Sequence, residues 1–471
     1  MLACHWGGPS NVPSAAKKQA GAVCEDGSTG KMDISRTVIG QHPVGERVRF
    51  KLAGRKRAEG ADVDPRRWSE RAEARLRSLT YRQKIAALVL AAMVLYGGFI
   101  ALDGLGVRSW LDSSFGETPD LKYYQERTKV ILNGGMLYRD LDIESPPLIN
   151  YFLVPAQLLG GEWWSYEIYL SLFPLLTGLV IYTVMRRWDD YYAFLVALIY
   201  IANPYLLPDA TWGIQDEPIV AFIYILPILL FLHGYRRTAG AVTAAGFWTK
   251  FLPIVLYPVL LIKLDSVKEK LINIGVAVAT SLLIAAPFLL AAPMEFLHFP
   301  SYYLLEREGS AGLSVISLLS KGGLHIDGLI GAGLTVAVLL LSYYLIHRWK
   351  LDIWRGAMLT TVMFLCTYPM AHLNYFVMLF VFFLVWAVRD KWLIVRLALM
   401  YVLLLFSEGF SLNSVPGMAT EWNWLIALPM MLANIVLMAD TTRICLKTKC
   451  FLDREPQGER DKKGEGAPES A

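Results

Sequence analysis

The sequence predicts an all-α integral membrane protein with about ten or eleven transmembrane helices and with interfacial helices in its first outer loop. Hydrophobic residues make up 55% of the 471 positions, and the mean hydropathy is +0.40. One soluble core cannot hide that much apolar surface. Apolar runs of about 20 residues, the length needed to cross the hydrocarbon, also recur between short basic turns. The excess apolar surface must therefore face lipid.

Composition divides the chain into three regions. Residues 1–84 are polar and lack apolar periodicity, so we expect a cytoplasmic, largely disordered basic region. Met32 is an alternative start, because the residues before it look like low-complexity read-through. Residues 85–442 form the polytopic domain, in which 108–162 is the first outer loop. Residues 443–471 form a cytoplasmic polar tail.

Basic residues orient the spans, because Lys and Arg favour the cytoplasmic side of a membrane. They mark turns at alternate ends of the apolar runs, at Arg186, Arg236, Lys263, Arg348, Arg389 and Arg443. These turns and both termini are therefore predicted to be cytoplasmic. The segment 238–262 begins and ends beside such charges. Because Gly246, Lys250 and Pro253 interrupt it, we expect two half-helices that return to the same side.

Charge, glycine and cysteine patterns narrow the function classes. The net charge is only +4, and basic residues cluster at span ends, so no nucleic-acid partner is indicated. The chain has no Gly-rich phosphate loop, which argues against direct use of a nucleotide sugar. The five cysteines lack metal-ligand or disulfide spacing. Cys445 and Cys450 follow the last span and could be acylated, although reduced bystanders are the favoured interpretation.

The first outer loop carries the strongest candidate for chemistry. Thr118 can cap a helix and Pro119 fits its first turn, which places Asp120 where exposed backbone N–H groups favour an ionised carboxylate. Tyr124 and Arg127 follow at spacings that share the same helical face. A base, an aromatic surface and a cation are thus predicted to converge.

Three other carboxylates of this loop compete with Asp120 as a base: Asp140, Asp142 and Glu144. Asp140 is the strongest rival because it lies at the end of the same loop. Surface acids are, however, most often solvated bystanders. The apolar stretch that begins at Pro147 is too short to span, so we expect it to form an interfacial helix.

Charged residues beside or inside later spans supply further candidates. Asp216 and Glu217 lie at the outer end of a span and could hold Mg²⁺ or Mn²⁺, although no cluster with clear ligand spacing indicates a metal or another cofactor. Lys250 interrupts an apolar segment. A charge at the bilayer centre costs at least about 2.5 kcal/mol, so Lys250 either faces inward for a function or snorkels.

Two more outer segments carry cationic candidates. Arg307 could bind an anion, but pairing with its neighbours Glu306 and Glu308 explains it equally well. His372 and Tyr375 lie at a span end, where polar and aromatic residues also form interfacial belts. Both interpretations stay open for each segment.

Four segments together carry a family resemblance: PDLKYYQERTKVILNGGMLYRDLDIESPPLINYFLVP (119–155), WGIQDEP (212–218), TAGAVTAAGFWTKFLPIVLYP (238–258) and HLNYF (372–376). They resemble the multi-spanning glycosyltransferases of the C superfold, in particular the polyprenol-phosphate-mannose-dependent mannosyltransferases. The resemblance covers roughly residues 85–390. Its spacing is most specific in the first outer loop.

The resemblance implies inverting transfer of one sugar, mannose, from a polyprenyl-monophosphate donor to a glycan, lipid or protein acceptor at the outer or lumenal face. Asp120 matches the family's catalytic aspartate in the first loop. Such a reaction needs a carboxylate to take the acceptor's proton and cations to stabilise the departing phosphate. Lys250, Arg307 and His372 are the candidates for the phosphate. The compact chain favours a prokaryotic cell membrane.

Two other function classes remain. A transporter or flippase of lipid-linked sugars would carry ionisable groups in several spans. We expect almost none in the spans apart from Lys250, which favours the transferase. A structural membrane subunit is the third possibility, and in that case Asp120 would be replaceable without loss of activity.

Overall fold

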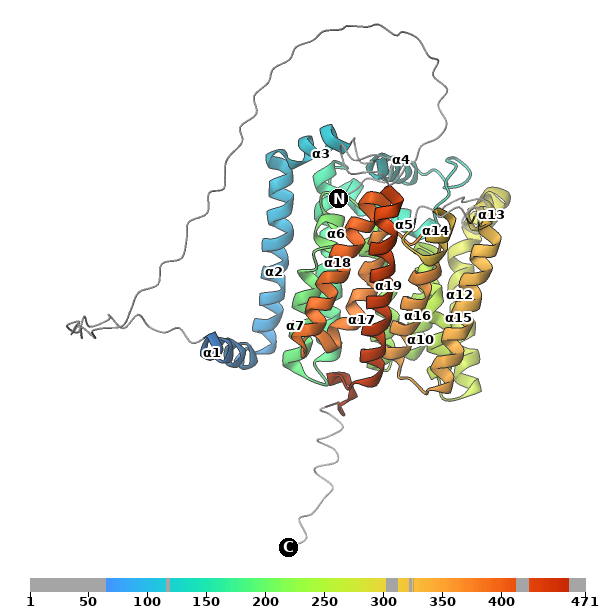
Figure 1. The fold of residues 1–471 in the computed structure, drawn as a ribbon. Helices are drawn as coiled ribbons and strands as arrows, with labels where there is room; N and C mark the ends of the chain where they lie inside the picture. The colour runs from blue at the N-terminus through green and yellow to red at the C-terminus, as the bar shows by residue number, and fades with distance from the viewer. Residues whose placement is uncertain are drawn as a thin grey trace, which may run out of the picture. The chain divides into compact units, whose positions relative to one another are not determined.

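The computed structural model describes residues 65–115, 119–301, 312–321, 324, 326–411 and 423–456 (Figure 1). The regular elements of these residues are helices, so the predicted all-α fold class is confirmed. The described residues fall into two units, 65–74 and 75–456, of which the first holds most of α1 (Pro65–Ser78). The predicted disorder before residue 65 and the end of the polar tail lie outside the described residues.

Among the described residues, six helical stretches are long and apolar enough to cross a membrane, which makes the chain a multi-pass integral membrane protein. They are Tyr81–Ser113, which contains α2 (Tyr81–Leu102), η1 (Asp103–Val107) and most of α3 (Arg108–Phe115); Trp163–Met185 (α6); Val267–Ala291 (α12); Gly328–Arg348 (α15); Lys391–Phe410 of α18 (Lys391–Ser411); and Leu425–Asp453, which overlaps α19 (Asn423–Lys447) and η5 (Phe451–Asp453). Capping residues fix where such a helix starts. At the start of α2, for example, Thr80 and Gln83 form a reciprocal capping box.

Five shorter apolar helices pack among the long ones. They are α7 (Asp190–Ile201), α9 (Glu217–His233), η2 (Leu252–Leu256) with α11 (Tyr257–Lys263), α16 (Ile353–Thr367), and η4 (Leu373–Phe376) with α17 (Val377–Ala387). A helix of about 15 residues rises about 22 Å, which is less than the hydrocarbon thickness of about 30 Å. The six long stretches alone fall short of the predicted ten or eleven spans, and adding all five shorter apolar helices gives eleven.

The remaining helices connect the spans. They are α4 (Pro119–Leu132), α5 (Pro147–Leu158), α8 (Leu206–Ala210), α10 (Arg236–Thr249), α13 (Pro293–Ser301) and α14 (Val315–Lys321). Within the second unit, α3, α4 and α13 lie at the same end of the long helices (Figure 1), which we call the α4 end. Helix α5 forms where an interfacial helix was expected, and it packs against α4 and α6.

At the opposite end of the bundle, ion pairs join basic residues to acidic residues of neighbouring segments. Lys84 of α2 is bonded to Asp190 of α7, and Arg454 Nη1 lies 2.6 Å from Asp189 Oδ2. Phe451 is fully buried beside them and stacks on Tyr192. The chain after α19 is thus packed against the bundle as far as Arg454.

Burial also decides between the two interpretations of the cysteines near the end of α19. Cys445 and Cys450 are both buried free thiols. Acylation requires an accessible thiol at the membrane surface. The bystander interpretation is therefore the one that fits.

The interrupted segment between Arg236 and Lys263 returns to the side where it starts, as predicted. Helix α10 ends at Thr249, Lys250 has extended backbone angles, and η2 and α11 carry the chain back. Arg236 Nη1, at the start of α10, lies 2.7 Å from Asp265 Oδ2, just after α11. Lys250 therefore lies at the point where the chain reverses.

Gly246 allows the two arms of this reversal to approach closely. A Cβ atom at Gly246 would lie 2.8 Å from both Ile223 Cγ2 and Pro253 Cβ, whereas one at Gly275 of α12 would meet nothing within 4 Å. Relieving these contacts requires η2 to shift at Pro253 and the buried Ile223 side chain to change rotamer or to move with α9. Overpacking of this kind typically costs about 1–3 kcal/mol.

We predict that Gly246→Ala lowers the thermal midpoint of the detergent-solubilised protein. Gly275→Ala is the matched control and should leave the midpoint unchanged or slightly raised, because alanine favours a helix over glycine by about 0.5–1 kcal/mol. Differential scanning fluorimetry measures both. Equal midpoints for the two variants would contradict the close packing at Gly246.

Candidate functional site

Asp120 lies at the second position of α4, at the helix N-terminus that the sequence predicted for it. Gln215 Nε2 donates a hydrogen bond of 2.8 Å to Asp120 Oδ2. Burial raises the pKa of the Asp120 carboxyl above its usual range, and the hydrogen bond from Gln215 opposes that rise. The predicted cap at Thr118 lies outside the described residues.

Lys250 binds the two acidic residues at the start of α9. Its Nζ lies 2.8 Å from Asp216 Oδ1 and 2.7 Å from Glu217 Oε1, and 5.2 Å from the centre of the Tyr375 ring. The side chains of Lys250 and Asp216 are each 15% exposed and that of Glu217 is 6% exposed. Residues that the sequence singled out in three separate segments thus form one group, the Lys250 cluster: Asp216, Glu217, Lys250 and Tyr375.

Gln215 joins Asp120 to the Lys250 cluster. It precedes Asp216 in the chain, and its Oε1 accepts a hydrogen bond of 3.4 Å from Asn374, the neighbour of Tyr375. The charges of the cluster also act on Asp120, since Asp216 raises the pKa of Asp120 and Lys250 lowers it. One continuous polar site therefore includes α4, the start of α9, the chain reversal at Lys250 and η4.

His372 lies beside this site with a carboxylate that the sequence analysis did not identify. Its Nδ1 is 3.6 Å from Glu408 Oε1, and its ring centre is 6.1 Å from that of Tyr375. Glu408 Oε1 also accepts a hydrogen bond of 3.1 Å from the backbone N–H of Leu373. Glu408 therefore holds the segment that carries His372 and Tyr375.

Tyr124 and Arg127 follow Asp120 along α4 with different surroundings. Tyr124 is buried and stacks on Tyr166, with 6.1 Å between ring centres. The Arg127 guanidinium lies 5.4 Å from the Tyr123 ring centre, and its charge lowers the pKa of Asp120. Arg127 is thus a cation close enough to act on the carboxylate.

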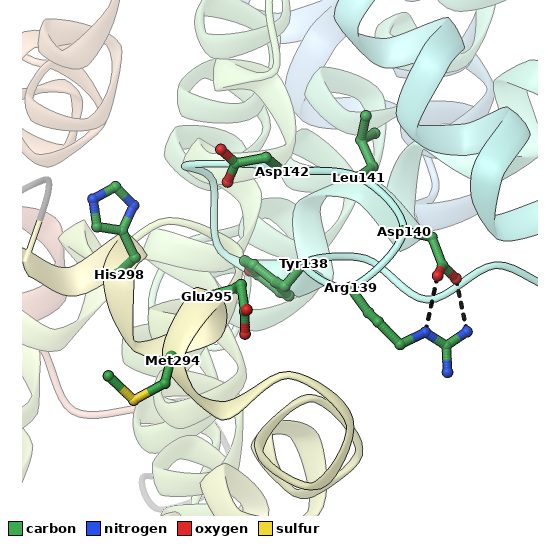
Figure 2. Close-up of a pocket in the computed structure, with 8 residues that line it drawn as sticks. All are labelled: Tyr138, Arg139, Asp140, Leu141, Asp142, Met294, Glu295 and His298. Atoms are coloured by element: carbon green, nitrogen blue, oxygen red, sulfur yellow. Dashed lines mark hydrogen bonds and ion pairs between the residues drawn. The ribbon is translucent and has the colours of Figure 1, made fainter.

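Asp140 belongs to a different part of the α4 end. It lines an open cavity of about 580 Å³ (Figure 2) between the loop before α5 and helix α13, whose other lining residues are Tyr138, Arg139, Leu141, Asp142, Met294, Glu295 and His298. Arg139 donates two hydrogen bonds to its carboxylate, of 2.8 and 2.9 Å, and the N–H of Met136 donates a third. These bonds lower the pKa of Asp140 to about 2. A carboxylate that holds protons so weakly is a poor general base.

The remaining candidates from the sequence are Arg307, Asp142 and the suggested metal ligands. Arg307 lies outside the described residues. Asp142 lines the same open cavity as Asp140. Across the described ranges, no three His, Cys, Asp or Glu side chains are grouped so that they could hold a metal ion. The acids Asp216 and Glu217, the suggested metal ligands, are both bonded to Lys250.

The expectation that the spans hold almost no ionisable group besides Lys250 is wrong. Asp103 and Arg108 lie in the first long stretch, Glu167 in the second and Glu408 in the fifth. Arg108 Nη2 lies 2.8 Å from Asp103 Oδ2 and 2.9 Å from Glu167 Oε1, and both carboxylates are fully buried. Charges near span ends are tolerated because they pair across helices that are distant in sequence, which hydropathy cannot reveal.

The fold and these contacts define a multi-pass, all-α membrane protein with a buried charged site at its α4 end. No protein-family model, no curated protein and no solved structure matches the chain.

We predict that Lys250→Met destabilises the fold strongly. Removing the cation leaves Asp216 and Glu217 buried without a counter-charge, which typically costs about 3–5 kcal/mol. Adding Asp216→Asn and Glu217→Gln to the same variant should restore much of the thermal midpoint. Lys129→Met, at an exposed position of α4, is the matched control and should have little effect. A Lys250→Met variant as stable as the parent would contradict the buried ion pairs.

Proposed function

We propose that the chain is a membrane glycosyltransferase that moves one sugar, mannose, from a polyprenyl-monophosphate donor to a glycan, lipid or protein acceptor. The observation that carries the proposal is the pairing of Asp120 with the Lys250 cluster through Gln215. The resemblance of the segments around these residues to the C superfold of glycosyltransferases supports the same reaction.

In the proposed reaction, Asp120 takes the proton from the acceptor hydroxyl as that oxygen attacks the anomeric carbon. The bond from this carbon to the phosphate oxygen breaks on the opposite face, so the configuration inverts. Lys250 stabilises the charge that develops on the departing lipid phosphate, Arg127 is a further cation at the site, and the imidazole of His372 is a further candidate donor to the phosphate. Because burial raises the pKa of Asp120, this carboxylate accepts a proton more readily than an ordinary aspartate.

The surroundings of the site support a donor that arrives through the membrane. The long apolar helices expose large hydrophobic side chains. A polyprenyl chain can lie against these side chains while its phosphate reaches the polar residues at the helix ends. We place the α4 end on the outer face of the membrane, because the basic turns of the opposite end favour the cytoplasm. The compact chain favours a prokaryotic cell membrane.

One observation favours a second candidate function, which is a transporter or flippase of lipid-linked sugars. The buried group of Asp103, Arg108 and Glu167 is the kind of intramembrane charge that marks transport pathways. These residues lie where α2 ends, where α3 begins and in the first turns of α6. That position at span ends supports chemistry at one face more than passage through the midplane.

We predict that Asp120→Asn lowers mannose transfer from polyprenyl-phosphate-mannose to a membrane acceptor extract by about a hundredfold or more, the range expected for a lost general base. Asp140→Asn, compared at equal folded yield, should keep most of the activity because Asp140 lies in the separate open cavity. Equal transfer by the parent and Asp120→Asn would refute Asp120 as the base. Translocation of lipid-linked sugar without transfer would support the transporter instead.

The activity of the parent should also fall as the pH is lowered through the raised pKa of Asp120, because protonation removes the base. We expect the acid limb of kcat/KM to lie above the pH range where an ordinary aspartate titrates. A pH profile between about 4 and 8 measures it. Full activity retained at the acid end of that range would argue against a buried carboxylate base.

The proposed orientation can be tested with single cysteines in a cysteine-free background. Tyr123→Cys on α4 and Lys268→Cys on α12 occupy exposed positions. In intact cells, a membrane-impermeant maleimide should label position 123 and should label position 268 only after permeabilisation. The reverse pattern would place the α4 end in the cytoplasm.

A further inference from the structure

The turn that carries Gln215 is held in a strained conformation. Ile214 is fully buried with a φ of 47°, a region that β-branched residues rarely adopt. Three backbone hydrogen bonds of 2.8–2.9 Å close the turn: Gly213 N–H to Pro208 O, Ile214 N–H to Thr211 O, and Gln215 N–H to Asp209 O. Strain of this kind persists only where the surrounding structure fixes it, and it is concentrated at functional sites.

The side-chain amide of Gln215 uses both its donor and its acceptor groups. Its Nε2 donates 2.8 Å to Asp120 Oδ2 and 2.9 Å to Gly213 O, while its Oε1 accepts from Asn374 Nδ2 at 3.4 Å. Rotating the amide by 180° would turn the carbonyl toward two oxygen acceptors and the NH₂ group toward a donor. The network therefore fixes the orientation in which the NH₂ group faces Asp120.

We infer that Gln215 is the positioning residue of the base: it binds Oδ2 of Asp120 so that Oδ1 is held toward the acceptor hydroxyl. The inference rests on the proposed function, in which Asp120 takes the acceptor's proton. A buried carboxylate that swings between rotamers loses the alignment needed for proton transfer. The strained turn and Asn374 supply the rigidity, because they hold the amide from two sides.

The same hydrogen bond favours the ionised form of Asp120. The charged groups that act on Asp120 are Asp216, which raises its pKa, and Lys250 and Arg127, which lower it. Gln215 stabilises the carboxylate form more directly than any of these, because its N–H donates to the charged oxygen. Removing this donor should raise the pKa of Asp120 further. The pH range over which the base is ionised should then begin at a higher pH.

The test compares Gln215→Met with Gln125→Met. Gln125 lies on the same helix as Asp120, and its Nε2 donates 2.7 Å to Gly161 O. The control thus also loses a hydrogen bond, but one that does not reach the base. The acid limb of kcat/KM for transfer from polyprenyl-phosphate-mannose should move up by about one pH unit in Gln215→Met and stay in place in Gln125→Met. A direct titration of Asp120 by ¹³C NMR of labelled aspartate carboxyls, assigned by difference from Asp120→Asn, should show the same shift.

The outcomes separate this inference from the proposed function. An unmoved limb and an unmoved titration in Gln215→Met, with Asp120→Asn inactive, would overturn the positioning role and leave the function standing. A parent that transfers no mannose would overturn the proposed function, while the NMR titration would still report on the contact. An Asp120→Asn variant as active as the parent would refute Asp120 as the base, and the inference with it. If Gln215→Met fails to fold, Asn374→Leu tests the same network, and it should shift the titration in the same direction by a smaller amount. No shift in Asn374→Leu would then overturn the inference.

Discussion

The contact of Lys250 with Asp216 and Glu217 is the interaction on which the arrangement of the site depends. Lys250 lies where the chain reverses between α10 and η2, and the two acids begin α9, so the ion pairs tie an interrupted segment to a continuous helix. A buried charge is costly unless it is paired. The reversal and the start of α9 must therefore stay together, and this places Gln215 next to Asp120.

The ionisable residues of the site lie at the ends of helices. Asp120 is the second residue of α4, Glu217 begins α9, and His372 precedes η4. Helix ends leave backbone groups that need partners, and they lie where an apolar span can give way to polar surroundings. A lipid donor needs such a place, because its chain is apolar and its phosphate is charged. The position of these residues at helix ends is thus consistent with chemistry on a membrane-bound substrate.

Hydropathy, basic turns and local breaks were enough to predict the all-α membrane fold, the reversal at Lys250 and the helix that begins beside Asp120. They also identified the pair Asp216 and Glu217, the cation Lys250, and Tyr375 in three separate segments. They could not reveal the contacts, because Gln215 meets Asp120 across 95 positions of the sequence and Asn374 across 159. Glu408 and Glu167 were missed for a related reason. A single acid in an apolar run shows its role only when its partner on another helix is known.

The most direct test of the account is a structure of the protein with polyprenyl phosphate, the product that the proposed reaction releases, determined by electron cryomicroscopy in lipid nanodiscs. The account predicts that the phosphate lies within hydrogen-bonding distance of Lys250 and that Asp120 faces the space beside it. A phosphate bound away from both residues, with Lys250 still paired to Asp216 and Glu217, would contradict it.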